Sequence, residues 1–213
     1  SFLKSHGVQT VMMLGKVRTG LIFKREDFDA SATSLWNRME DRSPAGILRA
    51  VIEFIEEKGL RVASPDCLFE PQFCRAGVLT ANRPEVALVE DIDFGLRMAK
   101  HLADLEVGQT VVVKDRAIVA VEGMEGTDQT IARGGELAGR GIVAAKAGRT
   151  RQDLRVDIPA VGLATVRSLI RAGGAGLGLE AGRVAFFQRD EAVALADANG
   201  LLIAVREVKE GGG

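Results

Sequence analysis

The sequence predicts an α/β fold in two domains, and three observations support this prediction. A chain of 213 residues with 46% hydrophobic side chains can bury one large core or two modest ones, and usual domain sizes favour two. Short apolar runs alternate with segments whose apolar residues recur at helical spacing. Residues 107–109 interrupt that alternation. We therefore expect a partial Rossmann-like domain over residues 1–106 and a mixed-sheet α/β domain over 107–213.

Charge and cysteine usage argue against several classes of protein. The 28 basic and 29 acidic residues leave a net charge of -1 and no basic tail, so nucleic acid is not an expected partner. Cys67 and Cys74 have neither Cys-x-x-Cys spacing nor a neighbouring histidine, which argues against a metal site or a disulfide framework. No apolar run is long enough to span a bilayer, and any membrane contact would therefore be peripheral.

The first domain begins in an unusual way. Residues 1–7 are typical of the last turn of a helix that ends at Gly7, and a strand is expected over 8–14. Because a helix does not usually begin in its final turn, we expect the natural protein to continue before Ser1. Lys16 and Arg18 follow the strand, where open α/β sheets usually hold their ligand, although a solvated turn is an equal alternative.

The middle of the first domain is predicted to be helical. Residues 24–43 are polar and irregular, which predicts a long loop or short broken helices. Ser43 and Pro44 then favour the start of a helix that ends at Gly59, with a strand over 60–63 behind it.

Residues 85–105 predict a long helix with two apolar stripes. Such a helix needs cover on two sides, from core, from a second subunit or from an apolar ligand, and core is the favoured interpretation. One stripe consists of Leu88, Ile92, Leu96, Ala99 and Ala103, and the other of Phe94, Met98, Leu102 and Leu105.

The second domain mixes strands and helices. Asp153 to Pro159 alternates polar and apolar residues, which predicts a strand with Asp153, Arg155 and Asp157 on one face. The other expected elements are a hairpin over 111–114 and 117–122, a helix over 128–137, a strand over 142–145, a helix over 163–172, a hairpin over 175–179 and 184–188, a helix over 190–200 and a strand over 201–205.

Acidic side chains gather in the glycine-broken turn that precedes the helix at 128–137. A helix start normally attracts an anion, but Glu125 and Asp128 would repel a phosphate unless a divalent cation stood between them. For Asp128 alone, capping of the helix is somewhat favoured over metal binding. Lys146 ends a buried strand, and Arg149 and Arg151 follow it, which places cations where they can neutralise phosphate oxygens.

These side chains indicate metal-assisted hydrolysis at phosphorus. Carboxylates without histidine or cysteine favour Mg²⁺ or Mn²⁺ over zinc. Carboxylates that hold such a cation, beside cations that hold phosphate oxygens, are the groups needed for attack of water on phosphorus. His6 and His101 both lie on helices of the first domain without a nucleophile signature, so serine–histidine catalysis is not expected.

Five separated motifs carry a resemblance to a known family. They are the turn over 119–128, the strand that ends at Lys146, residues 153–162 with Thr165, and, in the first domain, residues 15–18 and 76–80. In these motifs the chain resembles UDP-2,3-diacylglucosamine pyrophosphatase, in the form unrelated to the calcineurin-like phosphoesterases. The resemblance covers nearly the whole chain. Members of that family carry an additional glycine-rich strand and turn at the amino terminus, in agreement with a chain that continues before Ser1.

The resemblance implies a hydrolase of lipid A biosynthesis in Gram-negative bacteria. Such an enzyme would use Mg²⁺ or Mn²⁺ to cleave UDP-2,3-diacylglucosamine into 2,3-diacylglucosamine 1-phosphate, called lipid X, and UMP. The family's essential aspartate corresponds to Asp157 of this sequence. The resemblance also implies a homodimer in the cytoplasm, peripheral on the inner face of the inner membrane, where the lipid-linked substrate lies.

Taken together, these interpretations give a set of candidate site residues. Asp157 and Asp128 are the candidate catalytic acids, and Asp157, Glu125 and Glu122 are the candidate metal ligands. We expect the site in a crevice between the two domains. The candidate substrate-binding residues are Lys16, Arg18, Thr127, Lys146, Arg149, Arg155 and Thr165.

Two other function classes stay open. A module that binds nucleotide-lipids without turnover would need the cations but not the acids, and the four candidate carboxylates argue against it. A nucleotide-dependent oxidoreductase would need a Gly-x-Gly-x-x-Gly turn after a strand. Residues 1–213 contain no such turn, but residues before Ser1 could supply one.

Overall fold

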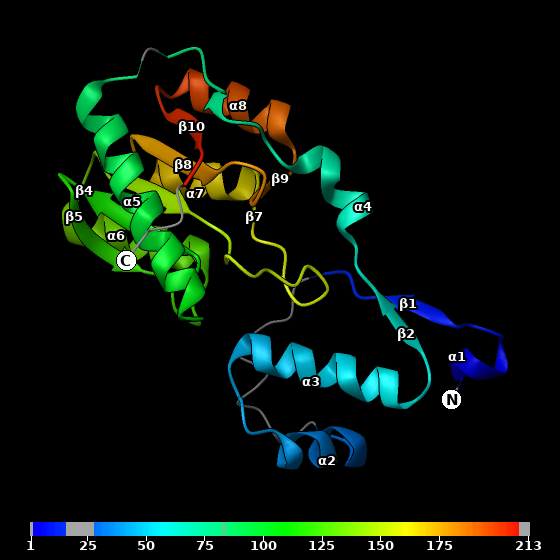
Figure 1. Ribbon diagram of the computed structural model, residues 1–213. Coiled ribbons are helices and arrows are strands. Elements are labelled where there is room, and N and C mark those ends of the chain that lie inside the picture. The colour runs from blue at the N-terminus through cyan, green and yellow to red at the C-terminus, as the bar shows by residue number, and fades with distance from the viewer. Residues whose placement is uncertain (1, 16–27, 83, 209–213) are drawn as a thin grey trace. The chain divides into compact units, whose positions relative to one another are not determined.

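The computed structural model describes residues 2–15, 28–82 and 84–208, and it confirms the α/β class (Figure 1). The chain forms two compact units. The first contains residues 1–68 together with 153–157, and the second contains 69–152 and 158–213. The division after Leu68 differs from the boundary expected at 106, because the helix before 106 packs on the sheet of the second unit.

In the first unit, two short parallel strands lie beside helices. Val11 of the first strand pairs with Val62 of the second. Ser43 caps the longest helix as predicted, since its hydroxyl accepts a hydrogen bond from the Gly46 amide at 3.0 Å. The elements are α1 (Phe2–Ser5), β1 (Thr10–Met12), α2 (Ala30–Arg38), α3 (Pro44–Glu57) and β2 (Arg61–Ala63). Helix α2 is one of the short helices expected within 24–43.

The core of the first unit includes one residue from far along the chain. Ala45, Ile52 and Val62 form a buried cluster with Val156, which belongs to the segment 153–157. That segment is not the strand predicted from its alternation. Residues 154–156 form a turn, in which the amides of Val156 and Asp157 donate to the Asp153 carbonyl oxygen at 3.0 and 3.2 Å. Within the turn over 154–156, Val156 is the one buried residue, with 7% of its surface exposed.

The second unit is built on a six-stranded mixed sheet with the order β3-β10-β8-β6-β4-β5. Strands β6, β8 and β10 run parallel, while β4 runs antiparallel to both of its neighbours. The strands are β3 (Gly77–Val78), β4 (Thr110–Lys114), β5 (Ala117–Val121), β6 (Val143–Lys146), β8 (Gly176–Glu180) and β10 (Leu202–Arg206). The mixed sheet and the first hairpin, β4 with β5, are confirmed.

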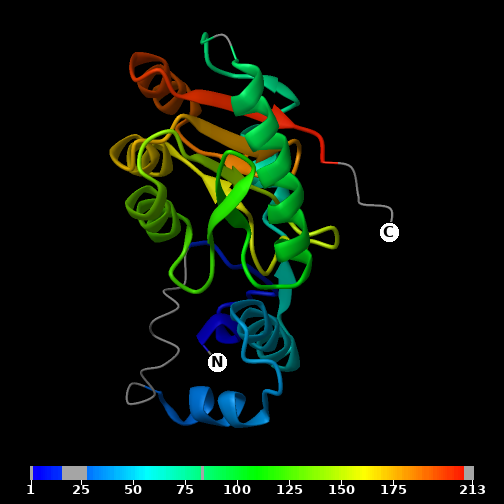
Figure 2. The same ribbon diagram turned by 90° about the vertical axis from the view of Figure 1, so that its left-hand side faces the viewer.

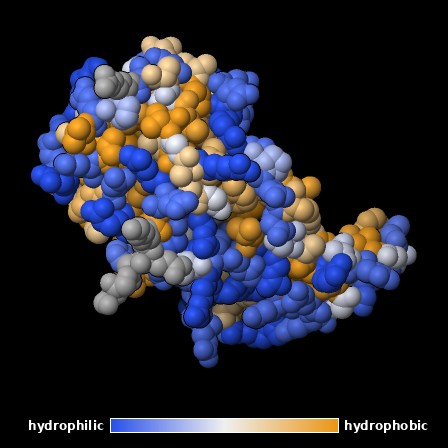
Figure 3. Space-filling model, turned by 45° about the horizontal axis from the view of Figure 1, so that its top comes forward, coloured by the Kyte–Doolittle hydropathy of each residue, from blue (hydrophilic) through white to orange (hydrophobic). Residues whose placement is uncertain are grey.

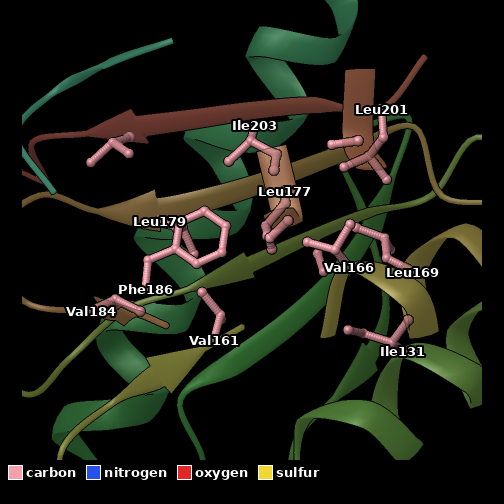
Figure 4. Close-up of a cluster of buried hydrophobic side chains, with 14 of the residues drawn as sticks. Ile131, Val161, Val166, Leu169, Leu177, Leu179, Val184, Phe186, Leu201 and Ile203 are labelled. Atoms are coloured by element: carbon pink, nitrogen blue, oxygen red, sulfur yellow. The ribbon is translucent and has the colours of Figure 1, made fainter. Parts of the chain in front are cut away.

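Helices cover both faces of this sheet (Figure 2). Helix α5 (Val86–Asp104) covers one face, where Ile92 and Leu96 pack on Val143, Ala145, Leu202 and Ala204. Gly178 of β8 allows this close packing, because a Cβ there would lie 2.7 Å from Ile92 Cγ2. The other face is covered by α6 (Thr127–Ala138), α7 (Leu163–Arg171) and α8 (Arg189–Ala198), whose apolar side chains form the largest buried cluster, part of which is shown in Figure 4.

The second predicted hairpin is wrong. Strand β8 lies between two parallel neighbours, β6 and β10, and both of its edges are therefore taken. Strand β9 (Ala185–Phe186) instead pairs in parallel with β7 (Ala160–Val161) outside the main sheet. The remaining elements are α4 (Asp66–Phe69) and a 3₁₀ helix over Glu70–Gln72.

On the face seen in Figure 3, hydrophobic residues lie among hydrophilic ones. Throughout the ranges that the structure covers, helices are too short or too polar to cross a bilayer.

Candidate functional site

Polar side chains of the second unit gather at one edge of its sheet, which we call the carboxyl edge. Strands β6, β8 and β10 end there in Lys146, Glu180 and Arg206. Thr110, at the start of β4, lies opposite Lys146 because β4 runs antiparallel to β6. Glu122 follows β5 and donates its amide to the Thr110 carbonyl oxygen at 2.9 Å. Such an edge is where α/β sheets usually bind ligands.

Three of the candidate site residues meet there in a buried network. Lys146 Nζ donates to Thr127 Oγ1 at 2.8 Å and to Thr110 Oγ1 at 3.0 Å, and it lies 3.4 Å from Glu122 Oε2. Thr127 Oγ1 donates to Glu122 Oε1 at 2.9 Å, and the Gln109 amide donates to Glu122 Oε2 at 3.2 Å. The structure therefore brings Glu122, Thr127 and Lys146 together.

Electrostatics in this network hold Glu122 in its ionised form. Burial by itself would raise the pKa of Glu122, but the Lys146 ammonium and hydrogen bonds from Thr110, Thr127 and Gln109 outweigh burial, so the pKa lies below its ordinary value. The charge of Lys146 is correspondingly matched by Glu122. Because the two charges already compensate each other, Glu122 is less suited to bind a metal ion, and Lys146 less suited to bind a phosphate, than the sequence indicated.

Glu125 and Asp128 lie around the start of α6. Glu125 forms an ion pair with Arg133 and accepts a hydrogen bond from the Gly123 amide at 3.0 Å. Burial works against the charge of Glu125, yet its own backbone amide, Arg133 and Gly123 lower its pKa. Asp128 is exposed in the first turn of α6. The capping position belongs to Gly126, with φ 85°, and not to Asp128.

Arg149 lies just beyond β6 with a side chain that is 14% exposed. Its Nη1 is 3.8 Å from Glu106 Oε1, and its buried Nε has no hydrogen-bond partner among the atoms that the structure describes. A buried guanidinium nitrogen without a partner is costly. Arg206, at the end of β10, likewise has a buried Nε without a hydrogen-bond partner, although this atom lies 3.3 Å from Asp93 Oδ1, so Arg149 is one of two such cations at the carboxyl edge.

The sequence analysis missed a second buried ion pair at the same edge. Lys100 Nζ lies 2.9 Å from Glu180 Oε1, and both side chains are 5% exposed. The signal was available in the sequence. Lys100 interrupts the apolar residues of α5, and Glu180 ends an apolar strand just as Lys146 does. A charge at such a position needs a buried partner.

The remaining candidate residues belong to the first unit, to α7 of the second unit, or to the part of the chain outside the described residues. Asp157 and Arg155 belong to the first unit. There Arg155 pairs with Asp153 at 2.8 Å and with Glu56 at 3.5 Å, while Asp157 is half-buried. Thr165 is buried on α7. Lys16 and Arg18 lie outside the described residues, so the crevice expected between the domains stays a prediction.

Glu122 and Glu125, the candidate metal ligands of the second unit, do not belong to a metal-binding cluster in the part of the chain that the structure describes. No group of three or more histidine, cysteine, aspartate or glutamate residues lies together there. The cause is local, since Glu122 is paired with Lys146 and Glu125 with Arg133. Within the described part of the second unit, Glu122 and Glu125 therefore do not supply a metal cage by themselves.

Comparison with known proteins identifies the family. The LpxI C-terminal domain model matches residues 75–204, and the LpxI N-terminal domain model matches residues 1–71. The chain belongs to the LpxI family. The border between the two LpxI models, at 71–75, lies close to the division of the structure after Leu68.

One curated member of the LpxI family shows the relationship in more detail. UDP-2,3-diacylglucosamine pyrophosphatase LpxI from Caulobacter vibrioides is 34% identical over 165 residues, which is 74% of this chain. The matched region spans 59% of that relative, so the chain corresponds to a little over half of its length. The resemblance read from the sequence motifs is confirmed at the level of the family.

Proposed function

We propose that the protein hydrolyses the pyrophosphate bond of UDP-2,3-diacylglucosamine and releases 2,3-diacylglucosamine 1-phosphate and UMP. The observation that carries this proposal is membership of the LpxI family over both domains, together with the pyrophosphatase name of the Caulobacter relative. The charge of the carboxyl edge supports it, because Arg149, with a side chain that is 14% exposed, places a guanidinium there, and guanidinium groups suit phosphate oxygens.

In the proposed reaction, cations hold the substrate and a carboxylate activates water. Cleavage of the bond develops negative charge on the departing phosphate oxygen, and a fixed guanidinium stabilises that charge. Arg149 is our choice for this role, since Lys146 is already matched by Glu122. Water needs a group that removes its proton as it attacks phosphorus. We assign this role to Asp157, with Asp128 as the second candidate.

We further propose that Mg²⁺ or Mn²⁺ supports the reaction. Mg²⁺ is usually held by one or two carboxylates together with phosphates of the substrate, so a cage of three protein ligands is not required. Asp157, to which the family's essential aspartate corresponds, and Asp128, exposed in the first turn of α6, are our ligand candidates, while the charges of Glu122 and Glu125 are matched within the second unit. When bound, the ion would supply positive charge to the phosphate oxygens.

Replacement of Asp157 tests the proposal. Asp157→Asn should retain the far-UV circular dichroism of the wild type and lose about 10²-fold or more in kcat, the scale for removal of a general base. Assays in Mg²⁺, in Mn²⁺ and with a chelator test the metal, and the chelator is expected to abolish turnover. Asp190→Asn, an exposed aspartate on α8, is the matched control and should leave kcat unchanged.

Two results would contradict these assignments. A folded Asp157→Asn variant with wild-type kcat would remove Asp157 from the mechanism and move the role to Asp128. A wild-type protein that binds UDP-2,3-diacylglucosamine without releasing UMP would instead be a nucleotide-lipid binding module.

The lipid-linked substrate also implies a place in the cell. We propose that the protein acts in the cytoplasm as a homodimer, peripherally bound to the inner face of the inner membrane. Exposed apolar side chains beyond the end of α5, Leu105 and Val107, offer one contact with lipid.

A further inference from the structure

The loop that follows β6, residues 147–152, is held in place by buried charges, and we call it the edge loop. Glu180 Oε2 accepts the amide of Gly148 at 2.9 Å, and Lys100 Nζ donates to the carbonyl oxygen of Gly148 at 3.1 Å. The two side chains also pair with each other at 2.9 Å. Both backbone groups of Gly148 are thus satisfied by one ion pair, which we call the clamp.

Further hydrogen bonds fix the rest of the edge loop. Asp104, near the end of α5, accepts from the Thr150 amide at 2.6 Å and from the Thr150 hydroxyl at 2.8 Å. Arg183 Nη1 donates to the carbonyl oxygens of Arg149 and Thr150, each at 3.3 Å. The Arg149 amide donates to the Gln152 side chain at 3.0 Å. Helix α5 and the segment after β8 therefore hold the loop from two sides.

The first four amides of the edge loop, those of residues 147–150, are occupied, so the chemistry of this part of the loop lies in its side chains. The amides of Gly148, Arg149 and Thr150 all donate within the protein, and they cannot form the backbone cradle that phosphate loops use. Besides the exposed Arg151, the loop carries the guanidinium of Arg149, which directly follows the anchored Gly148 and belongs to a side chain that is 14% exposed. The anchors therefore set where this guanidinium lies.

The clamp is costly for a purely structural contact. Burying two opposite charges removes both from water, and two apolar side chains of similar volume often stabilise a protein as well or better. The rest of α5 that faces the sheet follows the apolar solution, as Ile92 and Leu96 show. What the two charged side chains add is a fixed orientation of the backbone, because they form hydrogen bonds with both the amide and the carbonyl oxygen of Gly148.

We propose that Lys100 and Glu180 are positioning residues, whose ion pair fixes Gly148 so that Arg149 meets the phosphate oxygens of the substrate. This inference rests on the proposed hydrolysis and deepens it, since it names residues that act through another residue. The clamp itself does not touch the substrate. Loss of the clamp should misplace Arg149, and a misplacement of about 1 Å is enough to cost on the order of 10²-fold in rate.

The decisive variant replaces the clamp by apolar side chains in the full-length protein. Lys100→Met with Glu180→Leu should melt close to the wild type, because no charge is left buried without a partner. Its kcat/KM should nevertheless fall by roughly 10²-fold. Trypsin should cut at Arg149 and Arg151 on the order of 10-fold faster, because the loop opens locally more often. The control variant, Glu90→Met with Arg116→Met, removes an exposed ion pair that also involves α5. It should change neither kcat/KM nor the rate of trypsin cleavage in the loop.

A double-mutant cycle shows whether the clamp acts through Arg149. Arg149→Ala should lower kcat/KM strongly in the wild type and far less in the apolar clamp variant, because the clamp variant has already lost the contact. Equal losses in both backgrounds would mean that the clamp does not act through Arg149, which would overturn the inference.

A second variant keeps the test open if the apolar clamp folds poorly. Asp104→Ala removes an exposed anchor of the same loop and should lower kcat/KM while trypsin cleavage accelerates. Faster cleavage with unchanged kcat/KM would overturn the inference, because loop order would then not matter. If the wild type hydrolyses the substrate and the clamp variants have the same kcat/KM, this inference is overturned while the proposed function stands. A wild type without hydrolysis would overturn the proposed function, and the inference with it.

Discussion

Glu122 and Lys146 illustrate how a tertiary contact redefines the role of a residue. Each lies at the end of a strand on the carboxyl edge, a position at which a charged side chain often serves a ligand. In the folded protein the two charges face each other, with Thr110 and Thr127 bonded to them. Glu122 and Lys146 therefore act mainly on the stability of the fold and on the rigidity of the site. Removal of either side chain leaves the other charge buried without a partner.

The first prediction at this scale concerns acid. Glu122→Gln should lower the free energy of unfolding by about 3 kcal/mol at pH 7, because Lys146 loses its counter-charge. The folded-state pKa of Glu122 is lowered, so its contribution is complete above about pH 4.5, the value for an unperturbed glutamate, and is lost as the pH falls through the folded pKa. Urea unfolding of both proteins from pH 7 to pH 2 should show a difference that shrinks below pH 4.5.

Glu136→Gln, an exposed glutamate on α6, is the control for this series and should follow the wild type at every pH. A difference between Glu122→Gln and the wild type that stays constant down to pH 2 would show that Glu122 is not held ionised by its surroundings.

At the scale of the element, the packing of α5 shows what covers each of its two apolar stripes. The first stripe is core, with Ile92, Leu96, Ala99 and Ala103 buried. In the second stripe, Phe94, Met98 and Leu102 pack on a buried cluster that includes Val111 and Val113 of β4. Leu105, the last member, is 72% exposed. Most of the second stripe is thus covered by the protein's own sheet and needs no ligand to explain it.

The prediction for α5 separates core from lipid contact. Met98→Lys should lower the free energy of unfolding by several kcal/mol, because a charge would enter a packed cluster. Leu105→Lys should change it by less than about 0.5 kcal/mol, as for most surface substitutions. Guanidinium unfolding and diacyl-lipid binding, measured on both variants, provide the comparison. If Met98→Lys kept wild-type stability and lost lipid affinity, the second stripe would be a ligand surface.

At the scale of the whole molecule, the two units are not two consecutive stretches of chain. Residues 153–157 belong to the first unit, although the residues on both sides of them belong to the second. Val156 joins Ala45, Ile52 and Val62 in the core of the first unit. The first unit therefore depends on a segment, residues 153–157, that is flanked in the sequence by residues of the second unit. The candidate acid Asp157 lies in that segment.

A single substitution in the core of the first unit tests this dependence. Val156→Ala should destabilise the first unit by about 2 kcal/mol, through lost burial and the cavity left behind. Native-state hydrogen exchange should then show faster exchange in α3 and unchanged exchange in β8, because the two lie in different units. Val78→Ala, at a position that is 42% exposed on β3, should leave α3 unchanged. Faster exchange of β8 in Val156→Ala would show that Val156 does not serve the first unit alone.

The sequence by itself determined most elements and the family. Helices α3, α5 and α7 and strands β4, β5, β6 and β10 lie within a few residues of their predicted ranges. Local sequence patterns predict these elements, namely capping residues and apolar residues that recur at a fixed period. The motifs that end at Lys146 and surround Asp157 were equally local, and the family they indicated is the one that the LpxI models match.

Only the tertiary structure decided which of these pieces meet. Alternation along 153–159 predicted a strand, but no neighbouring strand pairs with it, and Val156 packs into the first unit instead. Glu122 and Lys146, both at strand ends, were predicted to bind ligands, but in the fold they pair with each other. Lys100 and Glu180, which the sequence analysis did not single out, form a second buried pair. Lys100 and Glu180 lie 80 positions apart in the sequence, and no local period records such a pairing. Burial decided it, because a charge removed from water is stable only beside a partner that the fold brings to it.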